Sequence, residues 1–438
     1  MIEEKVNTNI NSPLSQRLIK NSFYTGLALA FVGMIPFAFN FLVARTFGRE
    51  ILGTINISLS FCLIITIFVT NFFGSSGNKY LAEYRGRNHL EQFTFVFKIM
   101  FIGPIIILSI IGIILALNWD YFSQHFSLSP NLFFTLLSYI FLRSFYILIR
   151  RALYGIDLVR SYAMNEIISA VIMLVALIYV CYSGQSSFLV ECYVLCYALF
   201  CFLGIKTFIG NFDSITKKMV SSDDFDYKKI IKEFSNYGLV SMIGTVASTS
   251  TGYISVIIIG MYLNHSDAGL YSSVLSIASV LMFVPKLFTQ VFLPEFSKLF
   301  GEGNKQKIYQ IFNQTNTLML GLSAMICLIV FLFADDILSV FGKEFSNGSL
   351  ILKIILPSIF IRMISIPFVS FLSGTKYVLY PNIGGIFILL ISTICWILLV
   401  PKYQLIGIAI GYTTGIIIGI GYQIFVAIIK IRSFDAIG

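Results

Sequence analysis

Long apolar segments alternate with short polar stretches along almost the whole chain. Twelve of these segments are long enough to cross about 30 Å of hydrocarbon as α-helices. They lie near residues 20–44, 51–74, 94–117, 131–154, 160–182, 188–209, 237–262, 269–293, 314–334, 350–372, 378–400 and 404–429. Isolated prolines such as Pro36, Pro104 and Pro357 interrupt them, as membrane helices tolerate. The pattern predicts an all-α integral membrane protein with about twelve transmembrane helices.

Two of the predicted helices are related copies, and each carries an arginine near its middle. Residues 140–143 read Ile-Phe-Leu-Arg, and residues 359–362, which lie 219 positions later, read Ile-Phe-Ile-Arg. An arginine at the centre of a bilayer costs about 2.5–3.5 kcal/mol. Lipid gives no reason to keep two of them at matching depth. We therefore expect Arg143 and Arg362 to project from two similar halves into a polar cavity that receives negatively charged cargo.

The repeat extends beyond the arginines. At an offset of 216 residues, Gly53 corresponds to Gly269 and Ser60 to Ser276. Because each half holds six predicted helices, the two copies should have the same orientation in the membrane. This predicts two six-helix bundles related by a pseudo-two-fold axis along the membrane normal, with the substrate site between them.

The repeat also defines the expected domains. Residues 1–209 should form the N-terminal six-helix bundle and residues 237–438 the C-terminal one. The segment 210–236 carries clustered lysines and aspartates, which is typical of a solvated linker on the cytoplasmic surface.

Composition and charge agree with a membrane protein and predict its orientation. The chain is 57% hydrophobic and 12% charged, and its mean hydropathy is +0.87. Most of its 30 Lys and Arg residues lie in the terminal tails and in the loops on the same side, while the opposite loops hold Arg45, Arg49, Lys343 and Lys402. By the positive-inside rule both termini are cytoplasmic. The net charge of +9 therefore reflects topology, and we expect no nucleic-acid partner.

The sequence offers no pattern for a metal or a cofactor. The seven cysteines form no CxxC pair, and the three histidines are scattered at loops or loop edges. No GxxxxGK[ST] motif is present, so ATP is not expected to act directly on this chain. The first nineteen residues lack the apolar core of a cleavable signal peptide.

Helical spacing indicates which faces avoid lipid. On the fourth predicted helix, Tyr139, Arg143, Tyr146, Arg150 and Tyr154 recur at steps of 4, 3, 4 and 4 residues. This face of hydroxyl and guanidinium groups predicts that the two arginines and the tyrosines at 139 and 146 contact the substrate.

The eighth helix carries a comparable polar face. It includes Ser276, Lys286 and Gln290, which we also predict to contact the substrate. The seventh helix has a stripe of small polar residues over 241–255. Such stripes can equally mediate close helix packing, and for the seventh helix the two interpretations remain open.

Glu166 is one of the few acids within a predicted membrane helix, and its repeat counterpart is Gly385. It either binds a coupling proton or sodium ion, or neutralises Arg143 or Arg150. Pairing with an arginine is the simpler hypothesis.

Several short motifs resemble those of a known family. They are Arg45-x-x-Gly48 followed by Gly53, Gly269-Leu270-Tyr271 at the start of the eighth helix, and the stretch Leu-Pro-Glu-Phe-Ser-Lys-Leu at 293–299. With them the chain resembles the polysaccharide-transport branch of the multidrug/oligosaccharidyl-lipid/polysaccharide exporter superfamily, which includes bacterial O-antigen and capsule-unit flippases. One departure is Leu52, where an aromatic residue is usual.

The resemblance implies a transporter, not an enzyme. It would flip undecaprenyl-pyrophosphate-linked oligosaccharide to the periplasmic leaflet of the bacterial inner membrane by alternating access, beside membrane lipid, a polysaccharide polymerase and chain-length proteins. The family's cationic cavity would correspond by position to Arg143, Arg362 and Lys286. A cation-coupled multidrug exporter of the same fold is the main alternative, but the first and seventh helices lack the acids that cationic drugs require. A membrane glycosyltransferase or polymerase would need a larger outer loop than this chain has.

Overall fold

The described part of the chain is helical throughout. The computed structural model describes residues 13–126, 128, 130–217, 219–220, 226–283, 288–289, 292, 295–296, 299–300, 305–375 and 377–433. Its α-helices are α1 (Pro13–Gly86), α2 (Leu90–Leu117), α3 (Trp119–His125), α4 (Phe133–Gly155), α5 (Val159–Ser183), α6 (Leu189–Thr216), α7 (Tyr227–Tyr262), α8 (His265–Leu281), α10 (Lys305–Leu332), α11 (Ala334–Ser339), α12 (Ser349–Ile364), α13 (Ile366–Gly374) and α14 (Leu379–Ser433). Short 3₁₀ turns are η1 (Pro130–Leu132), η2 (Ser186–Phe188) and η3 (Lys343–Gly348). No named strand occurs among these residues, which confirms the all-α prediction.

Nine helices in the described residues are long and apolar enough to cross a membrane, and two of them are long enough to cross it twice. The apolar parts of α1 and α14 each contain 54 residues, which is about 80 Å of helix against about 30 Å of hydrocarbon. Each is interrupted by one non-helical residue, Gly48 in α1 and Gln404 in α14. With the shorter α8, the helices account for the twelve predicted spans.

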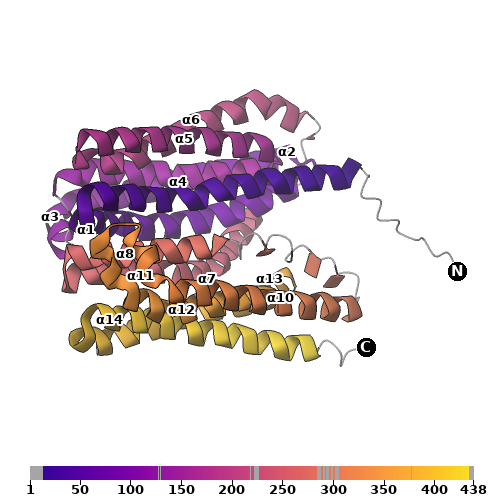
Figure 1. The fold of residues 1–438 in the computed structure, drawn as a ribbon. Coiled ribbons are helices and arrows are strands. Elements are labelled where there is room, and N and C mark those ends of the chain that lie inside the picture. The colour runs from indigo at the N-terminus through magenta and orange to yellow at the C-terminus, as the bar shows by residue number, and fades with distance from the viewer. Residues whose placement is uncertain are drawn as a thin grey trace.

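Hydrogen bonds show that α1 and α14 are hairpins. The Asn56 side chain donates to the Asn40 side chain at 3.0 Å, so the residues on either side of Gly48 lie side by side. In α14 the Trp396 indole donates to the carbonyl of Ile408 at 3.0 Å. We call the end of the molecule where these hairpins turn the hairpin end, and the opposite end, where α1 begins and α14 ends, the terminal end (Figure 1).

The tenth predicted helix is broken directly after its arginine. Helix α12 ends at Ile364 and α13 begins at Ile366, with Pro367 in its first turn. Proline has no N–H to donate, and its ring clashes with the carbonyl four residues earlier. Arg362 therefore lies in the last turn of a helix, and its sequence-related partner Arg143 lies in the middle of the continuous helix α4.

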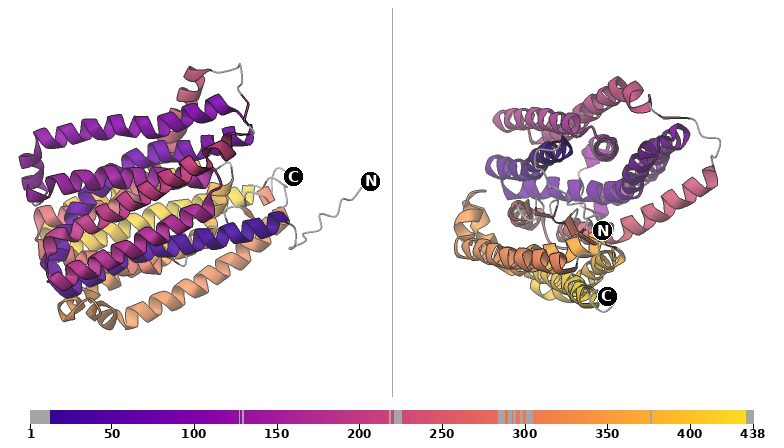
Figure 2. Two further views of the ribbon diagram at one scale, coloured as in Figure 1. Left: turned by 90° about the horizontal axis from the view of Figure 1, so that it is seen from above. Right: turned by 90° about the vertical axis from the view of Figure 1, so that its right-hand side faces the viewer.

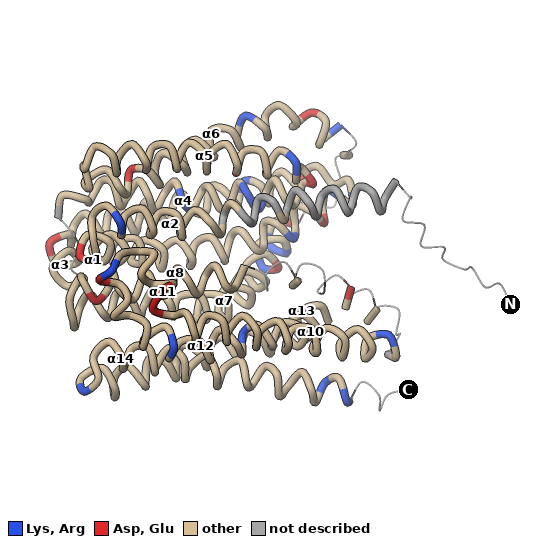
Figure 3. Tube along the Cα trace, viewed as in Figure 1, with Lys and Arg blue, Asp and Glu red and all other residues tan. Residues whose placement is uncertain are grey.

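The two sets of helices form two bundles that meet along α1. Helices α1–α6 lie together, and α7 and α8 of the second set pack along α1 (Figures 1 and 2). Charged residues gather toward the two ends of the bundles (Figure 3). Helices α6 and α7 extend into the predicted linker 210–236 from both sides, and Val220 between them exchanges backbone hydrogen bonds with the α1–α2 turn.

The repeat-related glycines Gly53 and Gly269 touch each other where α1 crosses α8. A methyl group on Gly53 would lie 1.8 Å from the carbonyl oxygen of His265, and one on Gly269 would lie 1.9 Å from the carbonyl oxygen of Arg49. Arg49 and His265 are themselves 216 residues apart. The contact is therefore reciprocal, as expected where a pseudo-two-fold axis passes between two copies.

Polar contacts hold the same crossing together at the hairpin end. The Arg49 guanidinium lies 3.7 Å from the Asp267 carboxylate, and the Arg49 backbone N–H donates to Glu344 at 3.2 Å. The Arg45 side chain donates to the carbonyl of Val340 at 2.8 Å. These contacts join the two bundles at this end.

Candidate functional site

A cavity of about 460 Å³ lies within the C-terminal bundle. Its walls come from α7, α12, α13 and α14, with Met282 and Thr289 on the side of α8. The polar lining residues are Tyr237, Ser241, Thr245, Ser248, Thr289, Arg362, Ser365, Ser370, Ser373, Asn382 and Gln423. Arg362 is the one charged residue among the described residues that line it. The cavity is therefore positively charged, without a counter-ion in its described wall.

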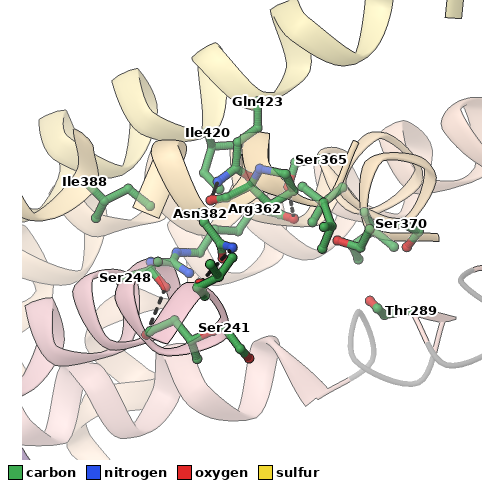
Figure 4. A pocket seen from close by; sticks show the side chains of 18 of the residues that line it. Ser241, Ser248, Thr289, Arg362, Ser365, Ser370, Asn382, Ile388, Ile420 and Gln423 are labelled. Carbon is green, nitrogen blue, oxygen red and sulfur yellow. Dashed lines mark hydrogen bonds between the residues drawn. The ribbon is translucent and has the colours of Figure 1, made fainter. Parts of the chain in front are cut away.

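Arg362 enters the cavity from the break between α12 and α13. Its side chain extends toward α7, the helix that carries Ser248 (Figure 4). The guanidinium Nε atom is buried and has no hydrogen-bond partner among the described residues, and the same holds for the Ser370 hydroxyl. Buried donors are normally satisfied, so these two groups indicate a place for a ligand.

Other polar groups of the lining are already occupied. The Ser365 hydroxyl donates to the Arg362 carbonyl at 2.8 Å, and the Asn382 amide donates to the Val240 carbonyl at 3.2 Å. The Gln423 amide donates to the Pro381 carbonyl at 3.0 Å. These three bonds help fix the shape of the wall, in which Arg362 is the charged donor.

The stripe on the seventh predicted helix divides between the two interpretations. Ser241, Thr245 and Ser248 line the cavity. Ser255 is fully buried, and its hydroxyl bonds to the carbonyl of Gly252 on its own helix. Only the half of the stripe nearer the terminal end is therefore available to a ligand.

Arg143 lies in a cage of tyrosines in the N-terminal bundle. Its Nη1 donates to the Tyr197 hydroxyl, and its guanidinium carbon lies 5.3 Å from the centre of the Tyr197 ring and 6.0 Å from that of Tyr139. Tyr193 and Tyr197 of α6 pack against Tyr139 edge to face. Cation–π contacts of this kind stabilise a buried guanidinium. Arg143 is not among the residues that line the cavity.

The cage nevertheless reaches the other bundle. Tyr253 of α7 lies within electrostatic range of Arg143, and the Arg143 Nε atom is buried without a partner among the described residues. That Arg143 and Arg362 face one shared cavity remains a prediction.

The difference between the two arginines follows from the residues beside them. At the 219-residue offset, Tyr139 corresponds to Ser358 and Tyr146 to Ser365. Tyr139 and Tyr146 are 1% and 5% exposed and fill the space around Arg143. Ser365, at the position equivalent to Tyr146, lines the cavity beside Arg362, whereas Ser358 is buried and does not. The smaller side chain at 365 leaves room that a tyrosine would fill.

Glu166, Tyr146 and Arg150 form a chain of polar groups on α4 and α5. The Tyr146 hydroxyl donates to the Glu166 carboxylate at 2.7 Å, and Arg150 donates to the Tyr146 oxygen at 3.3 Å. The Arg150 guanidinium also lies 5.8 Å from the centre of the Tyr162 ring. Tyr146, Arg150 and Glu166 thus lie together, and none of them is among the residues that line the cavity.

The predicted residues of the eighth helix have a different outcome. Ser276 is 5% exposed and accepts a hydrogen bond from the Asn40 side chain at 2.6 Å, so it joins the two bundles and does not line the cavity. Lys286 and Gln290 lie outside the described residues. Of the eight predicted substrate contacts, only Arg362 lines the described cavity.

Several polar residues of the two sites were not singled out from the sequence. Tyr193 and Tyr197 complete the cage of Arg143, and their four-residue spacing on α6 was the available signal. Arg151 donates to the carbonyl of Thr70 at 3.0 Å and to the side chains of Ser75 and Asn71, which ties α4 to α1.

No group of three or more His, Cys, Asp or Glu that could hold a metal ion occurs in the described part of the chain.

The fold is that of a multi-pass helical membrane protein with a cationic cavity. Several solved structures share the fold, and three of them are compared below. The inward-facing structure of a multidrug resistance MATE family transporter of the MOP superfamily has a TM-score of 0.78 at 12% identity and covers 92% of this chain and 96% of its own. The outward-facing structure of such a transporter has a TM-score of 0.70 at 14% identity, covering 98% of both chains. A MATE protein in the bent conformation has a TM-score of 0.69 at 13% identity, covering 96% of both.

Sequence comparison then identifies the family. Residues 18–300 match the family described as polysaccharide biosynthesis protein, and residues 241–401 match the family described as MatE. The chain belongs to the polysaccharide biosynthesis protein family, the polysaccharide flippase branch of the MOP superfamily, and this confirms the resemblance seen in its motifs.

One curated relative matches in part. It is the probable low-salt glycan biosynthesis flippase of Haloferax volcanii, 25% identical over 130 residues. The match covers 29% of this chain and 27% of the relative.

Proposed function

We propose that the protein moves lipid-linked oligosaccharide units across the membrane by alternating access, with the cargo's pyrophosphate bound at Arg362. The carrying observation is a cavity whose one charged lining residue, within the described part of the chain, is an arginine with a buried unpartnered donor. Membership of the polysaccharide biosynthesis family and the Haloferax flippase relative support a glycan cargo.

The chemistry of the cavity fits such a head group. A guanidinium presents a planar fork of donors that matches phosphate oxygens, and such charge-assisted bonds strengthen where water is excluded. Serine, threonine and amide side chains around it suit the hydroxyl groups of a sugar, and Tyr237 supplies an aromatic face. A volume of about 460 Å³ lies in the usual range for small-molecule sites. The polyprenyl tail would remain in the surrounding lipid.

The proposal includes an orientation and partners. The terminal end would face the cytoplasm of a bacterial plasma (inner) membrane, as the distribution of Lys and Arg predicts. The cargo would be O-antigen or capsule units, which a polymerase and chain-length proteins would then assemble.

A drug exporter is the second candidate function. It is favoured by the match of residues 241–401 to the MatE family and by the multidrug transporters that share the fold. Against it, no acid lines the described cavity wall, and a cationic drug at Arg362 would be repelled.

Binding and transport by the purified protein test the proposal. The wild-type protein should bind a short-chain polyprenyl-pyrophosphate disaccharide in detergent more tightly than the matching polyprenol without pyrophosphate. In proteoliposomes it should bring a fluorescent form of that lipid to the opposite leaflet.

The control cargo is a lipophilic cationic dye. Accumulation of the dye, with no binding of the pyrophosphate lipid, would reject the flippase in favour of the exporter. Equal affinity for the lipids with and without pyrophosphate would reject the role of the cationic cavity.

A further inference from the structure

Glu166 is a buried acid with only one of its two carboxylate oxygens hydrogen-bonded within the described part of the chain. It is the eighth of the 25 residues of α5 and is 3% exposed. Its Oε1 accepts the hydrogen bond from Tyr146, and its Oε2 is buried with no partner among the described residues. An ionised carboxylate in such a place pays for desolvation without full hydrogen bonding.

The structure does not give Glu166 a direct ion pair. Arg150 approaches the Tyr146 oxygen at 3.3 Å, and no Lys or Arg nitrogen among the described residues makes a salt bridge with the carboxylate. Arg143 and Arg150 act on it only through space. A proton on Oε2 would remove the cost of the unsatisfied oxygen, and the arginines favour its release. The two effects oppose each other, which is the condition for a group that changes its protonation in use.

We propose that Glu166 is a reversible proton-binding site of the transport cycle, which rests on the proposed transport of an anionic cargo. The titratable and charged groups around it come from three helices. They are Arg143, Tyr146 and Arg150 of α4, Tyr162 of α5, and Cys196 and Tyr197 of α6.

The protonation state of Glu166 can change the electrostatic field at the boundary between the two bundles. Arg143 interacts electrostatically with Glu166 in its own bundle and with Tyr253 of α7 in the C-terminal bundle. Loss of the proton leaves a carboxylate that offsets one arginine charge, and its return restores the net positive charge of the N-terminal bundle, which attracts an anionic cargo through space. Binding of an anion and binding of the proton are therefore mutually favourable, because coupling between two sites is reciprocal.

The repeat-related position in the C-terminal bundle does not hold a second such site. At the repeat-related position, a methyl group on Gly385 would lie 2.3 Å from the carbonyl of Gly244, so that place has no room for a side chain. Glu191 is the matched acid for comparison: its carboxylate accepts from Thr135 at 2.9 Å, and its Oε2 is also buried without a described partner. Glu191 lies in the first turn of α6, where the helix dipole stabilises negative charge.

Proteoliposome transport with imposed gradients tests the proposal. Wild-type transport of the pyrophosphate lipid should change several-fold with an imposed proton gradient and not with a sodium gradient. Glu166→Gln, which resembles the protonated acid and keeps an acceptor for Tyr146, should lose that response with its thermal stability nearly unchanged. Glu191→Gln should keep it.

An infrared titration of the protein without cargo keeps this test independent of the proposed function. The carbonyl band of a protonated carboxylic acid should appear and disappear with pH in wild type and in Glu191→Gln, and one such component should be missing in Glu166→Gln. If the wild type moves no pyrophosphate lipid while this component is present, the proposed function fails and the proton site stands. The proton site is overturned if Glu166→Gln keeps the full pH-dependent band, keeps the proton response, or if sodium alone drives the wild type.

Discussion

Arg362 and Arg143 occupy equivalent repeat positions but have different surroundings. The Nε atoms of both are buried without a described partner, but Arg143 has a hydrogen bond to Tyr197 and two tyrosine rings beside it, whereas Arg362 lines a cavity. A guanidinium that already bonds to protein groups has fewer free N–H donors for an incoming anion than one that does not. At the residue scale the two arginines should therefore have separable roles.

Replacing Arg362 should affect binding more than folding. We expect Arg362→Ala to weaken binding of the pyrophosphate lipid by about 10- to 100-fold, since a hydrogen bond to a charged group contributes about 1.5–3 kcal/mol. Arg362→Lys should recover part of the affinity, because a point charge lacks the two-pronged donor geometry. Isothermal titration measures both, with the exposed Lys402→Ala as the control. Unchanged affinity in Arg362→Ala would contradict the assignment.

Filling the cavity with the residue of the other repeat should abolish binding. Ser365→Tyr introduces the side chain that Tyr146 presents at the equivalent position, and Ser365 lines the cavity. Ser365→Ala removes only the hydroxyl bond to the Arg362 carbonyl and should bind nearly normally. The comparison uses the same titration, and tight binding by Ser365→Tyr would show that the cargo lies elsewhere.

The arginines were predictable from the sequence, but their surroundings were not. The cost of a charge in lipid indicated that Arg143 and Arg362 must avoid it, whatever they contact. Whether a polar face meets a cavity or another side chain depends on the neighbouring helices. The Tyr193 and Tyr197 rings that surround Arg143 come from α6. The Asn40 side chain that donates a hydrogen bond to Ser276 comes from α1.

At the scale of helices, arginine side chains bond α4 to its neighbouring helices, whereas Arg362 makes no such described bond for the broken α12–α13 pair. Arg143 links α4 to α6 through Tyr197, and Arg151 links α4 to α1. Arg143→Ala should therefore lower stability by roughly 1–3 kcal/mol, since it removes a hydrogen bond and cation–π contacts. Thermal melts in one detergent should show a clear drop for Arg143→Ala and little change for Arg362→Ala. Equal melting temperatures would contradict the structural role of Arg143.

Helix existence was the most predictable feature at this scale. Runs of about twenty apolar residues have few alternatives in a bilayer, so the twelve spans emerged from hydropathy alone. The break at Ser365 was not placed, although Pro367 was visible, because prolines are tolerated within membrane helices.

At the scale of the whole molecule, the crossing of Gly53 and Gly269 sets how closely the two bundles approach. Gly53→Ala would place a methyl group 1.8 Å from a carbonyl oxygen, so the backbones must separate. Overpacking typically costs about 1–3 kcal/mol, enough to shift a two-state equilibrium about 5- to 150-fold toward a form that is open at the hairpin end.

Spin labels measure this separation. In a background without the seven native cysteines, Glu50→Cys and Asp336→Cys place one label on each bundle near the hairpin end. The distance between them should lengthen in Gly53→Ala. It should not change in Gly252→Ala, since a methyl group there meets nothing within 4 Å. An unchanged distance in Gly53→Ala would show that the crossing is not part of the gate.

The confinement of the cavity to one bundle has a thermodynamic consequence. If the cargo's described contacts all belong to the C-terminal bundle, they travel with it and persist when the bundles change their relative orientation. A ligand that binds two states equally shifts no population between them, however tightly it binds. The cavity would then hold the cargo in both states. The direction of transport would be set by groups at the boundary between the bundles, whose surroundings change between the states. Arg143, which interacts electrostatically with Tyr253 of α7, is one such group.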